Sequence, residues 1–514
     1  MLAGGATAVV GTSTRAQTTV KQLVKILDEP TARAEGVHGQ TPTGLKRMIS
    51  GASLALGGTM VWQASNFVFN AVGAHALGPA RYGVFAASMA LLGFTTPLLA
   101  AVQAVASREA TSLTARKELG EALPMLRHYG IRVACGALVI GGAVAMASRW
   151  ISGVFHLDSA WLVVIIGATI PCYVVSHLFG GLLQGAEHFG RFALESIAEG
   201  SAKAILGILA MGLLWRTAFS GVLIVTVSSA LGLMTYLLLG LPVLHRSALS
   251  TTAGKSTATA TPQGLDATKR YTGGKRSGVA RYSVTAFVTY GLLAVMLSSD
   301  TLVAKHYFAN HQAGLYAGIS LSGKIAYFAA SSIFVVAFPI FSRQHDQGAG
   351  NWKGVLTTGG LVCVIAGTTA TLFALRPAWV VIPLLGGRYQ AAEGYVAWMA
   401  AVFGLYALAF LVSIYLLARK RRSVIALLAA GLVIQFAGFF AFHSTITNMM
   451  AVLALSFGAV LAGGLLLVPL GGRRETGTLD GKTSRRALPA PRRARDMCTE
   501  LVPARQTDIS GDIS

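Results

Sequence analysis

Long apolar runs, separated by short polar segments, fill most of the chain. An α-helix needs about 20 residues to cross a hydrocarbon core about 30 Å thick, and these runs reach that length. Backbone groups inside a bilayer must be hydrogen-bonded within their own segment, so the runs predict membrane-spanning helices. Twelve runs qualify: 50–76, 82–106, 126–148, 160–184, 191–215, 219–244, 282–307, 312–342, 354–376, 391–417, 423–444 and 448–470. The pattern therefore predicts an all-α polytopic membrane protein with about twelve transmembrane helices.

A polar linker at 245–281 divides these runs into two sets of six. It is rich in Ser, Thr, Gly, Lys and Arg, a composition typical of a flexible loop, which we place in the cytoplasm. The division predicts an N-terminal six-helix lobe over 48–244 and a C-terminal six-helix lobe over 282–470. The N-terminal segment 1–47 and the basic tail 471–514 are polar and are expected to be disordered.

Two apolar pieces are too short to span a membrane. Trp379–Leu385 is predicted to pack at the outer surface. Between Val20 and Leu27, apolar residues recur at helical spacing beside Lys21 and Lys25. That second piece is compatible with a short interfacial helix and equally with disorder.

The balance of charge excludes a soluble globular enzyme. Only 12% of the residues are charged and 54% are apolar, whereas a soluble domain carries about 25% charged residues. The net charge of +22 would otherwise suggest a nucleic-acid partner. The position of the charges along the chain decides between that interpretation and a membrane one.

Basic residues gather on one side of the predicted membrane. With the N-terminus in the cytoplasm, 34 of the 42 Lys and Arg residues fall in the two terminal segments, the linker and the inner loops. Five fall on the outer side: Arg81, Arg149, Arg216, Arg376 and Arg388. This bias agrees with the positive-inside rule and predicts a multi-pass cell-membrane protein with both termini in the cytoplasm. It also accounts for the basic excess without nucleic acid.

The two halves of the chain repeat each other at a shift of about 234 residues. The matching positions are Ser65-Asn66 with Ser299-Asp300, Tyr82-Gly83 with Tyr316-Ala317, Ser107-Arg108 with Ser342-Arg343, and Leu182-Leu183 with Leu416-Leu417. An even number of helices per repeat gives the halves the same orientation in the membrane. Parallel repeats are typical of alternating-access transporters, although channels and plain scaffolds also contain repeats.

Several short motifs resemble the polysaccharide-transporter branch of the multidrug/oligosaccharidyl-lipid/polysaccharide exporter superfamily. They are Asn66–Asn70 (NFVFN), Leu77–Gly83 (LGPARYG), Leu183–Phe189 (LQGAEHF), Ser299–Lys305 (SDTLVAK), Ala313–Ala317 (AGLYA) and Ala337–Ser342 (AFPIFS). The resemblance covers about residues 48–470. It implies two pseudo-symmetric six-helix bundles of the MATE type around a V-shaped cavity. It also implies that the protein moves an undecaprenyl-pyrophosphate-linked oligosaccharide from the inner to the outer leaflet.

The two ends of the chain depart from this family pattern. The segment 1–47 is longer than in many members, which makes Met48 an alternative start, and the basic tail has no family role. The implied partners are membrane lipids and the lipid-linked oligosaccharide, with a polysaccharide polymerase or glycosyltransferases as candidates.

No catalytic or cofactor motif accompanies these runs. The sequence has no nucleophile–base arrangement, metal-ligand spacing, phosphate-binding loop or dinucleotide fingerprint. Its four cysteines, Cys135, Cys172, Cys363 and Cys498, are scattered and form no cluster. We therefore expect no enzyme activity, no metal and no cofactor, and we expect an ion or substrate gradient to supply any energy.

Ionisable residues inside the apolar runs are the main candidates for function, because such groups are costly in a membrane. Glu195, Glu199 and Lys203 recur every four residues, so they share one helix face. Lys203 lies about 18 Å along its helix, and Lys324 lies at a similar depth in the other half. One lysine per lobe predicts a clasp for a pyrophosphate, with Glu199 beside it. The alternative for Lys203 is an i,i+4 ion pair with Glu199.

Four further polar residues complete the candidate set. Asn66 and Asn70 offer hydrogen bonds to sugar hydroxyls, or bridge neighbouring helices. Asp300 and Glu195 are candidates for ion coupling. For Asp300 the alternative is a capping contact with Lys305; Glu195 can also meet lipid headgroups or substrate.

Three other functions remain open. A drug or organic-cation antiporter of the same superfamily would present buried carboxylates to its cargo. A membrane glycan ligase or polymerase would need a larger outer loop than the longest one predicted, 376–391. A non-transporting scaffold would use the linker and tail as docking segments.

Overall fold

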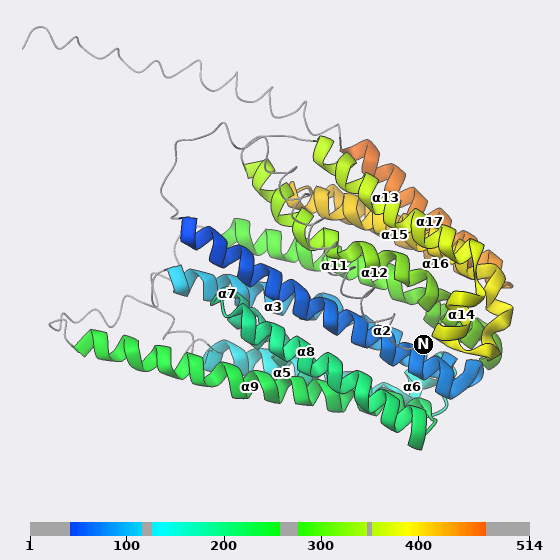
Figure 1. Ribbon diagram of the computed structural model, residues 1–514, viewed down its shortest axis with the longest axis horizontal. Coiled ribbons are helices and arrows are strands. Elements are labelled where there is room, and N and C mark those ends of the chain that lie inside the picture. The colour runs from blue at the N-terminus through cyan, green and yellow to red at the C-terminus, as the bar shows by residue number, and fades with distance from the viewer. Residues whose placement is uncertain (1–41, 116–125, 257–275, 347–351, 469–514) are drawn as a thin grey trace, which may run out of the picture. The chain divides into compact units, whose positions relative to one another are not determined.

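The computed structural model describes residues 42–115, 126–256, 276–346 and 352–468, and the described residues form helices without a β-strand (Figure 1). This confirms the predicted all-α fold class. In chain order the elements are α2 Pro42–Gly93, α3 Thr96–Ala115, η2 Leu126–Gly130, α5 Ile131–Met146, α6 Ser148–Val154, α7 Ala160–Gly185, α8 Phe189–Leu206, η3 Gly207–Leu214, α9 Ala218–Ser256, α11 Arg276–Tyr307, α12 Asn310–Asp346, α13 Trp352–Leu375, α14 Ala378–Leu385, η4 Gly387–Ala392, α15 Glu393–Ala418, α16 Ser423–Ala441 and α17 Ile446–Leu467.

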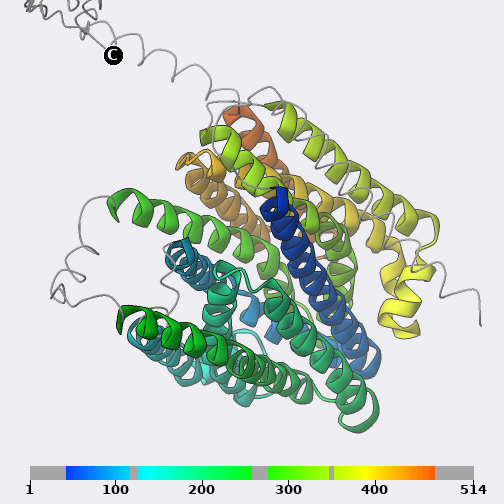
Figure 2. The same cartoon turned by 60° about the vertical axis from the view of Figure 1, so that its left-hand side comes forward.

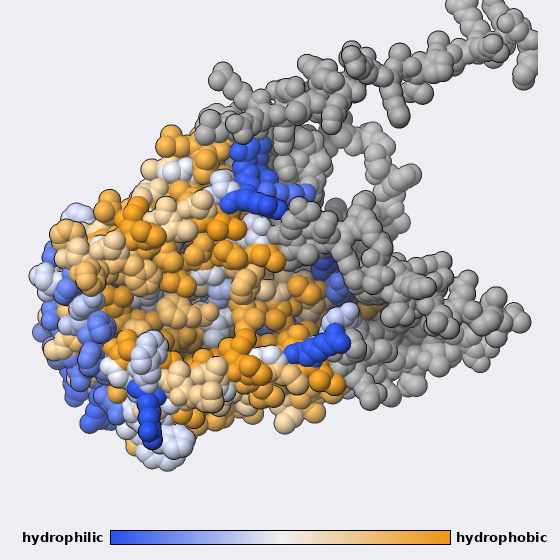
Figure 3. Space-filling model, turned by 180° about the vertical axis from the view of Figure 1, so that it is seen from behind, coloured by the Kyte–Doolittle hydropathy of each residue, from blue (hydrophilic) through white to orange (hydrophobic). Residues whose placement is uncertain are grey.

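The described helices have the length and polarity of membrane spans. Nine segments among the described residues are long and apolar enough to cross a bilayer, and a tenth arises if α5 and α6, bent by 57°, count as one span. Figure 3 shows apolar side chains covering the flank of the molecule and hydrophilic side chains toward both of its ends. This is the surface of a polytopic membrane protein. The number of twelve spans stays a prediction.

The first apolar segment, Ser53–Thr114, is too long for one crossing. Its 62 residues would extend about 93 Å as a straight helix, about three times the thickness of the hydrocarbon core. The chain breaks at Gly78, where φ is 67°, a conformation that glycine adopts without the clash of a Cβ. The rings of Phe69 and Phe85 lie 5.5 Å apart across this break, instead of about 24 Å in a straight helix. The chain therefore folds back at Gly78, between the first two predicted runs.

Several helices extend beyond their predicted ends. Helix α9 continues to Ser256 and α11 begins at Arg276, so both ends of the predicted loop 245–281 are helical. Proline is the residue that most strongly ends a helix. Helix α9 contains no proline after Pro242, so it can continue past the end of the apolar run. Helix α2 likewise begins at Pro42, before the predicted lobe. The remaining predictions for the linker, the segment 20–27 and the basic tail lie outside the described residues.

The two halves repeat the same helix contacts. In the first half, α2 packs against α8, α3 against α7, α7 against α5 and α9, and α8 against α9. In the second half, α11 packs against α16, α12 against α15, α15 against α13 and α17, and α16 against α17. Each helix of the second half thus takes the position of the helix that precedes it by one repeat. The contacts follow the internal repeat that the sequence contains.

Helices α2 and α3 connect the first half to α11 and α12 of the second. Helix α2 lies between α8 and α12 (Figures 1 and 2). The approach is closest where Gly314 of α12 faces Pro79 of α2, because a Cβ on Gly314 would lie 1.6 Å from the Pro79 carbonyl oxygen. Small residues at such a crossing let two backbones touch. Gly314 is therefore required for the halves to meet at this place.

We predict that Gly314→Leu destabilises the protein, because overpacking a tight contact costs about 1–3 kcal/mol or more. Gly367→Leu is the matched control, since a Cβ at Gly367 of α13 would meet no atom within 4 Å. Thermal unfolding of both variants in detergent measures the difference. Equal unfolding temperatures for the two variants would contradict the described contact.

Candidate functional site

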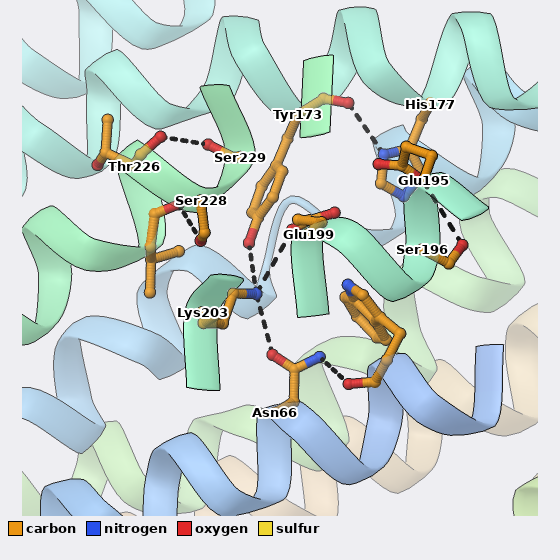
Figure 4. A network of polar contacts seen from close by, with 12 residues as sticks. Asn66, Tyr173, His177, Glu195, Ser196, Glu199, Lys203, Thr226, Ser228 and Ser229 are labelled. Carbon is orange, nitrogen blue, oxygen red and sulfur yellow. Dashed lines mark hydrogen bonds and ion pairs between the residues drawn. The ribbon is translucent and has the colours of Figure 1, made fainter. Parts of the chain in front are cut away.

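A buried polar cluster lies where α2, α7, α8 and α9 meet (Figure 4). Glu195, Glu199 and Lys203 share one stripe of α8, as predicted, and all three are buried. The stripe faces the interior of the first half, because α8 packs against α2 and α9. Charged groups in a membrane need partners to offset the loss of water, and neighbouring helices supply them here.

The ammonium group of Lys203 has partners on three helices. Its Nζ donates to Asn66 Oδ1 at 3.0 Å, to the Tyr173 hydroxyl at 3.3 Å and to Glu199 Oε1 at 3.5 Å. The Trp62 ring centroid lies 5.3 Å away, within the range of a cation–π contact. Lys203 is 2% exposed. The structure therefore contains the i,i+4 ion pair that the sequence offered as the alternative, and Lys203 is packed in protein rather than free to face a cavity.

Of the two candidate asparagines, only Asn66 belongs to this cluster. Its Nδ2 donates a hydrogen bond to the Trp62 carbonyl at 3.1 Å, while its Oδ1 accepts one from the Nζ of Lys203. Asn70, one turn later, donates to the Asn66 carbonyl at 2.8 Å. Asn66 thus bridges α2 and α8, and the described hydrogen bond of Asn70 stays within α2.

Glu195 lies two turns before Lys203 and has neutral partners. Its carboxylate accepts hydrogen bonds from the Tyr236 hydroxyl of α9 and, at 3.5 Å, from Ser196. Within the described part of the chain, no ion pair joins Glu195 to a Lys or Arg side chain. Glu195 is therefore the carboxylate of this cluster that is stabilised by hydroxyl groups, whereas Glu199 pairs with the ammonium group of Lys203.

A second polar cluster joins α11 and α12. Asp300, fully buried, lies 3.3 Å from the Nζ of Lys324, and the Ser320 hydroxyl donates to its other oxygen at 2.6 Å. Ser320 and Lys324 are one turn apart, so both face Asp300. No acidic residue lies within a turn of Lys324 on its own helix, and its carboxylate partner lies 24 residues earlier, on α11. Asp300 pairs with Lys324 rather than capping Lys305, which donates instead to Asn310.

The predicted lysine clasp therefore differs from the arrangement in the structure. Lys203 belongs to the first half and Lys324 to the second, and each is paired with a carboxylate of its own half. The Lys324 side chain keeps 15% exposure and lies 5.3 Å from the ring of Phe403. Of the two lysines, Lys324 is the more accessible.

The internal repeat also locates a polar residue that the sequence analysis missed. Gln435 of α16 is fully buried and donates to the Met296 carbonyl and to Ser299 Oγ, both at 3.0 Å. It links the fifth helix of its half to the first, as Lys203 does through Asn66. The shift of 234 residues, which pairs Asn66 with Asp300, pairs Gln435 with Ser201, two positions before Lys203, so the repeat indicated only the region of the helix. The equivalent link in the second half is therefore neutral.

We predict that Lys203→Met lowers the free energy of unfolding by about 3 kcal/mol, because it leaves Glu199 as an unpaired buried charge. Glu199→Gln in the same chain should restore much of this loss, since the glutamine side chain is neutral. Chemical unfolding of both single variants and of the double variant measures the coupling. Additive losses in the double variant would show that the two groups do not interact.

Comparison with known proteins identifies the fold. No protein-family model matches the sequence, and no curated protein matches it. Two solved structures of multidrug resistance MATE family transporters of the MOP superfamily are similar, each with 11% identity: one in an inward-facing conformation with a TM-score of 0.62 and one in an outward-facing conformation with 0.57. They cover 82% and 84% of this chain and 96% and 97% of their own.

A eukaryotic MATE transporter is also similar, with 15% identity, a TM-score of 0.50, and coverage of 83% of this chain and 96% of its own. The chain therefore has the MATE transporter fold, which the predicted fold class named.

Proposed function

We propose that the protein is a membrane transporter that works by alternating access between its two halves. The observation that carries this proposal is the repeated contact pattern of the two halves, which meet mainly through α2 and α3 on one side and α11 and α12 on the other. Two rigid units joined along a few helices can rock about a central site. The MATE fold supports the same interpretation.

Several links between the halves lie at one end of the helices. His75 Nε2 lies 3.2 Å from the Ile382 carbonyl, and the Tyr82 and Tyr389 rings meet edge to face. His306 Nδ1 lies 2.6 Å from the Val154 carbonyl. The positive-inside pattern assigns this end to the outer side. We infer a state that is closed toward the outside.

We further propose that the cargo is an undecaprenyl-pyrophosphate-linked oligosaccharide, moved from the inner to the outer leaflet of the cell membrane. The family resemblance of the motifs supports this cargo. Lys324 would bind a phosphate of the cargo in place of Asp300. In the other half, the more enclosed Lys203, with Glu199 and Asn66, would bind the cargo in the same way after leaving its present partners. A polysaccharide polymerase or glycosyltransferases would be its partners, and both termini would lie in the cytoplasm.

A drug or organic-cation antiporter is the second candidate. The similar solved structures include multidrug resistance transporters, and three buried carboxylates, Glu195, Glu199 and Asp300, are of the kind that exchange a proton for a cation. The described contacts offer no comparable support for a glycan ligase, a polymerase or a scaffold.

Deleting the gene separates the two candidates. For a flippase we predict that lipid-linked glycan accumulates in the inner leaflet, where a membrane-impermeant reagent does not reach it. Reintroducing the gene should reverse this accumulation. A membrane-impermeant glycan oxidant measures the distribution between leaflets. Normal glycan with lowered tolerance of cationic drugs would contradict the flippase and support the antiporter.

We propose Glu195 as the coupling carboxylate, with Asp300 as the other candidate. The titratable and charged groups that face Glu195 are Tyr236 of α9, Tyr173 of α7, and Glu199 and Lys203 of its own helix. We predict that Glu195→Gln removes the dependence of transport on a proton gradient while the protein still inserts, because glutamine cannot release a proton. Glu187→Gln, an exposed position eight residues earlier, is the matched control. Unchanged proton dependence in Glu195→Gln vesicles would exclude Glu195 from coupling.

A further inference from the structure

A groove of about 900 Å³ opens on the flank of the molecule, with walls from α2 and η3 of the first half and α12, α13 and α14 of the second. Its lining is mostly apolar, and several wall residues are exposed. Leu213 is 70% exposed and Trp379 is 75% exposed. On a membrane-spanning surface, exposed apolar walls of this kind are solvated by lipid chains. The shape therefore fits an extended hydrocarbon chain.

Three residues with basic side chains line this groove: His75, Arg216 and Arg388. Arg388 lies against the chain break of α2, because a Cβ at Gly78 would lie 3.0 Å from its Nη1. Arg81 donates to the Arg216 carbonyl at 3.0 Å. The positive side chains thus gather where the first half turns at Gly78 and begins α9.

Most of the arginines predicted on the outer side lie at or beside this groove. Only five Lys and Arg residues fall in the predicted outer loops. Arg216 and Arg388 line the groove, Arg81 contacts Arg216, and Arg376 lies 5.5 Å from the ring of the groove residue Trp379. In the described ranges, no ion pair joins Arg216 or Arg388 to a carboxylate. Single interfacial arginines commonly reach toward water, whereas two arginines on the two walls of one groove can both donate to the same anion.

We propose that the groove binds a membrane lipid with a phosphate headgroup, its chain along the apolar walls and its phosphate between Arg216 and Arg388. Guanidinium groups match phosphate oxygens in charge and in hydrogen-bond geometry. Arg216 belongs to the first half and Arg388 to the second, so the bound lipid bridges the halves. Such a ligand favours the conformation in which this end is closed. This lipid would bind whichever cargo the protein carries.

Native mass spectrometry of the full-length protein in detergent tests this site, with phosphatidic acid and diacylglycerol as probes. We expect retention of phosphatidic acid but not of diacylglycerol, and no displacement by millimolar inorganic phosphate. Arg216→Gln with Arg388→Gln should weaken phosphatidic acid binding about tenfold or more. Arg149→Gln, the outer arginine without a described contact to the groove, should bind as the wild type does.

A second variant tests the apolar wall. A Cβ at Gly212 would have Val72 as its nearest neighbour at 4.0 Å, so Gly212→Phe fills the groove and should reduce binding similarly. Gly142→Phe is its control, because nothing lies within 4 Å of a Cβ there. Wild-type binding in both the arginine and the Gly212 variants, equal retention of diacylglycerol, or displacement by free phosphate would overturn the proposal.

Discussion

The backbone contact between Pro79 and Gly314 is the constraint on which the arrangement of the two halves depends. It brings the turn of α2 against the start of α12 so closely that no side chain fits between them. A contact of this kind in a membrane relies on packing rather than on the hydrophobic effect, because lipid chains are as apolar as the helices. The neighbouring contacts of His75 and Tyr82 with α14 and η4 follow from the same approach. One small-residue crossing thus brings the two halves into backbone contact at this end of the helices.

Each half contains a buried pair of a lysine and a carboxylate. Lys203 pairs with Glu199 and Lys324 pairs with Asp300, whereas the buried Lys305 donates to the neutral Asn310. A buried ion pair is weak evidence for stability, since apolar replacements are often as stable. Its lysine can, however, exchange the carboxylate for a ligand that is also negatively charged. Glu195, held by hydroxyl groups, has the opposite property: proton uptake removes its charge without breaking an ion pair. The two kinds of site suit binding and coupling respectively.

The sequence predicted the helices well and their partners only in part. The runs 160–184 and 423–444 correspond to α7 and α16 within a few residues, because the apolar length of a span is a local property. The Lys203–Glu199 pair was foreseen as one alternative, since i,i+4 neighbours are fixed by the helix itself. The Lys324–Asp300 pair was not, because it depends on how α11 and α12 pack. The roles of Gln435 and of the groove arginines were not predicted, because they too depend on how the helices pack.

Double electron–electron resonance on two spin-label pairs in lipid nanodiscs tests alternating access most directly. With the four native cysteines replaced, one pair joins exposed sites at the proposed inner end, Glu187 and Arg422, and the other joins exposed sites at the proposed outer end, Asp158 and Gln390. The account predicts two populations in which a short outer distance accompanies a long inner distance, and the reverse. A single fixed distance for both pairs, under every gradient and cargo, would contradict it.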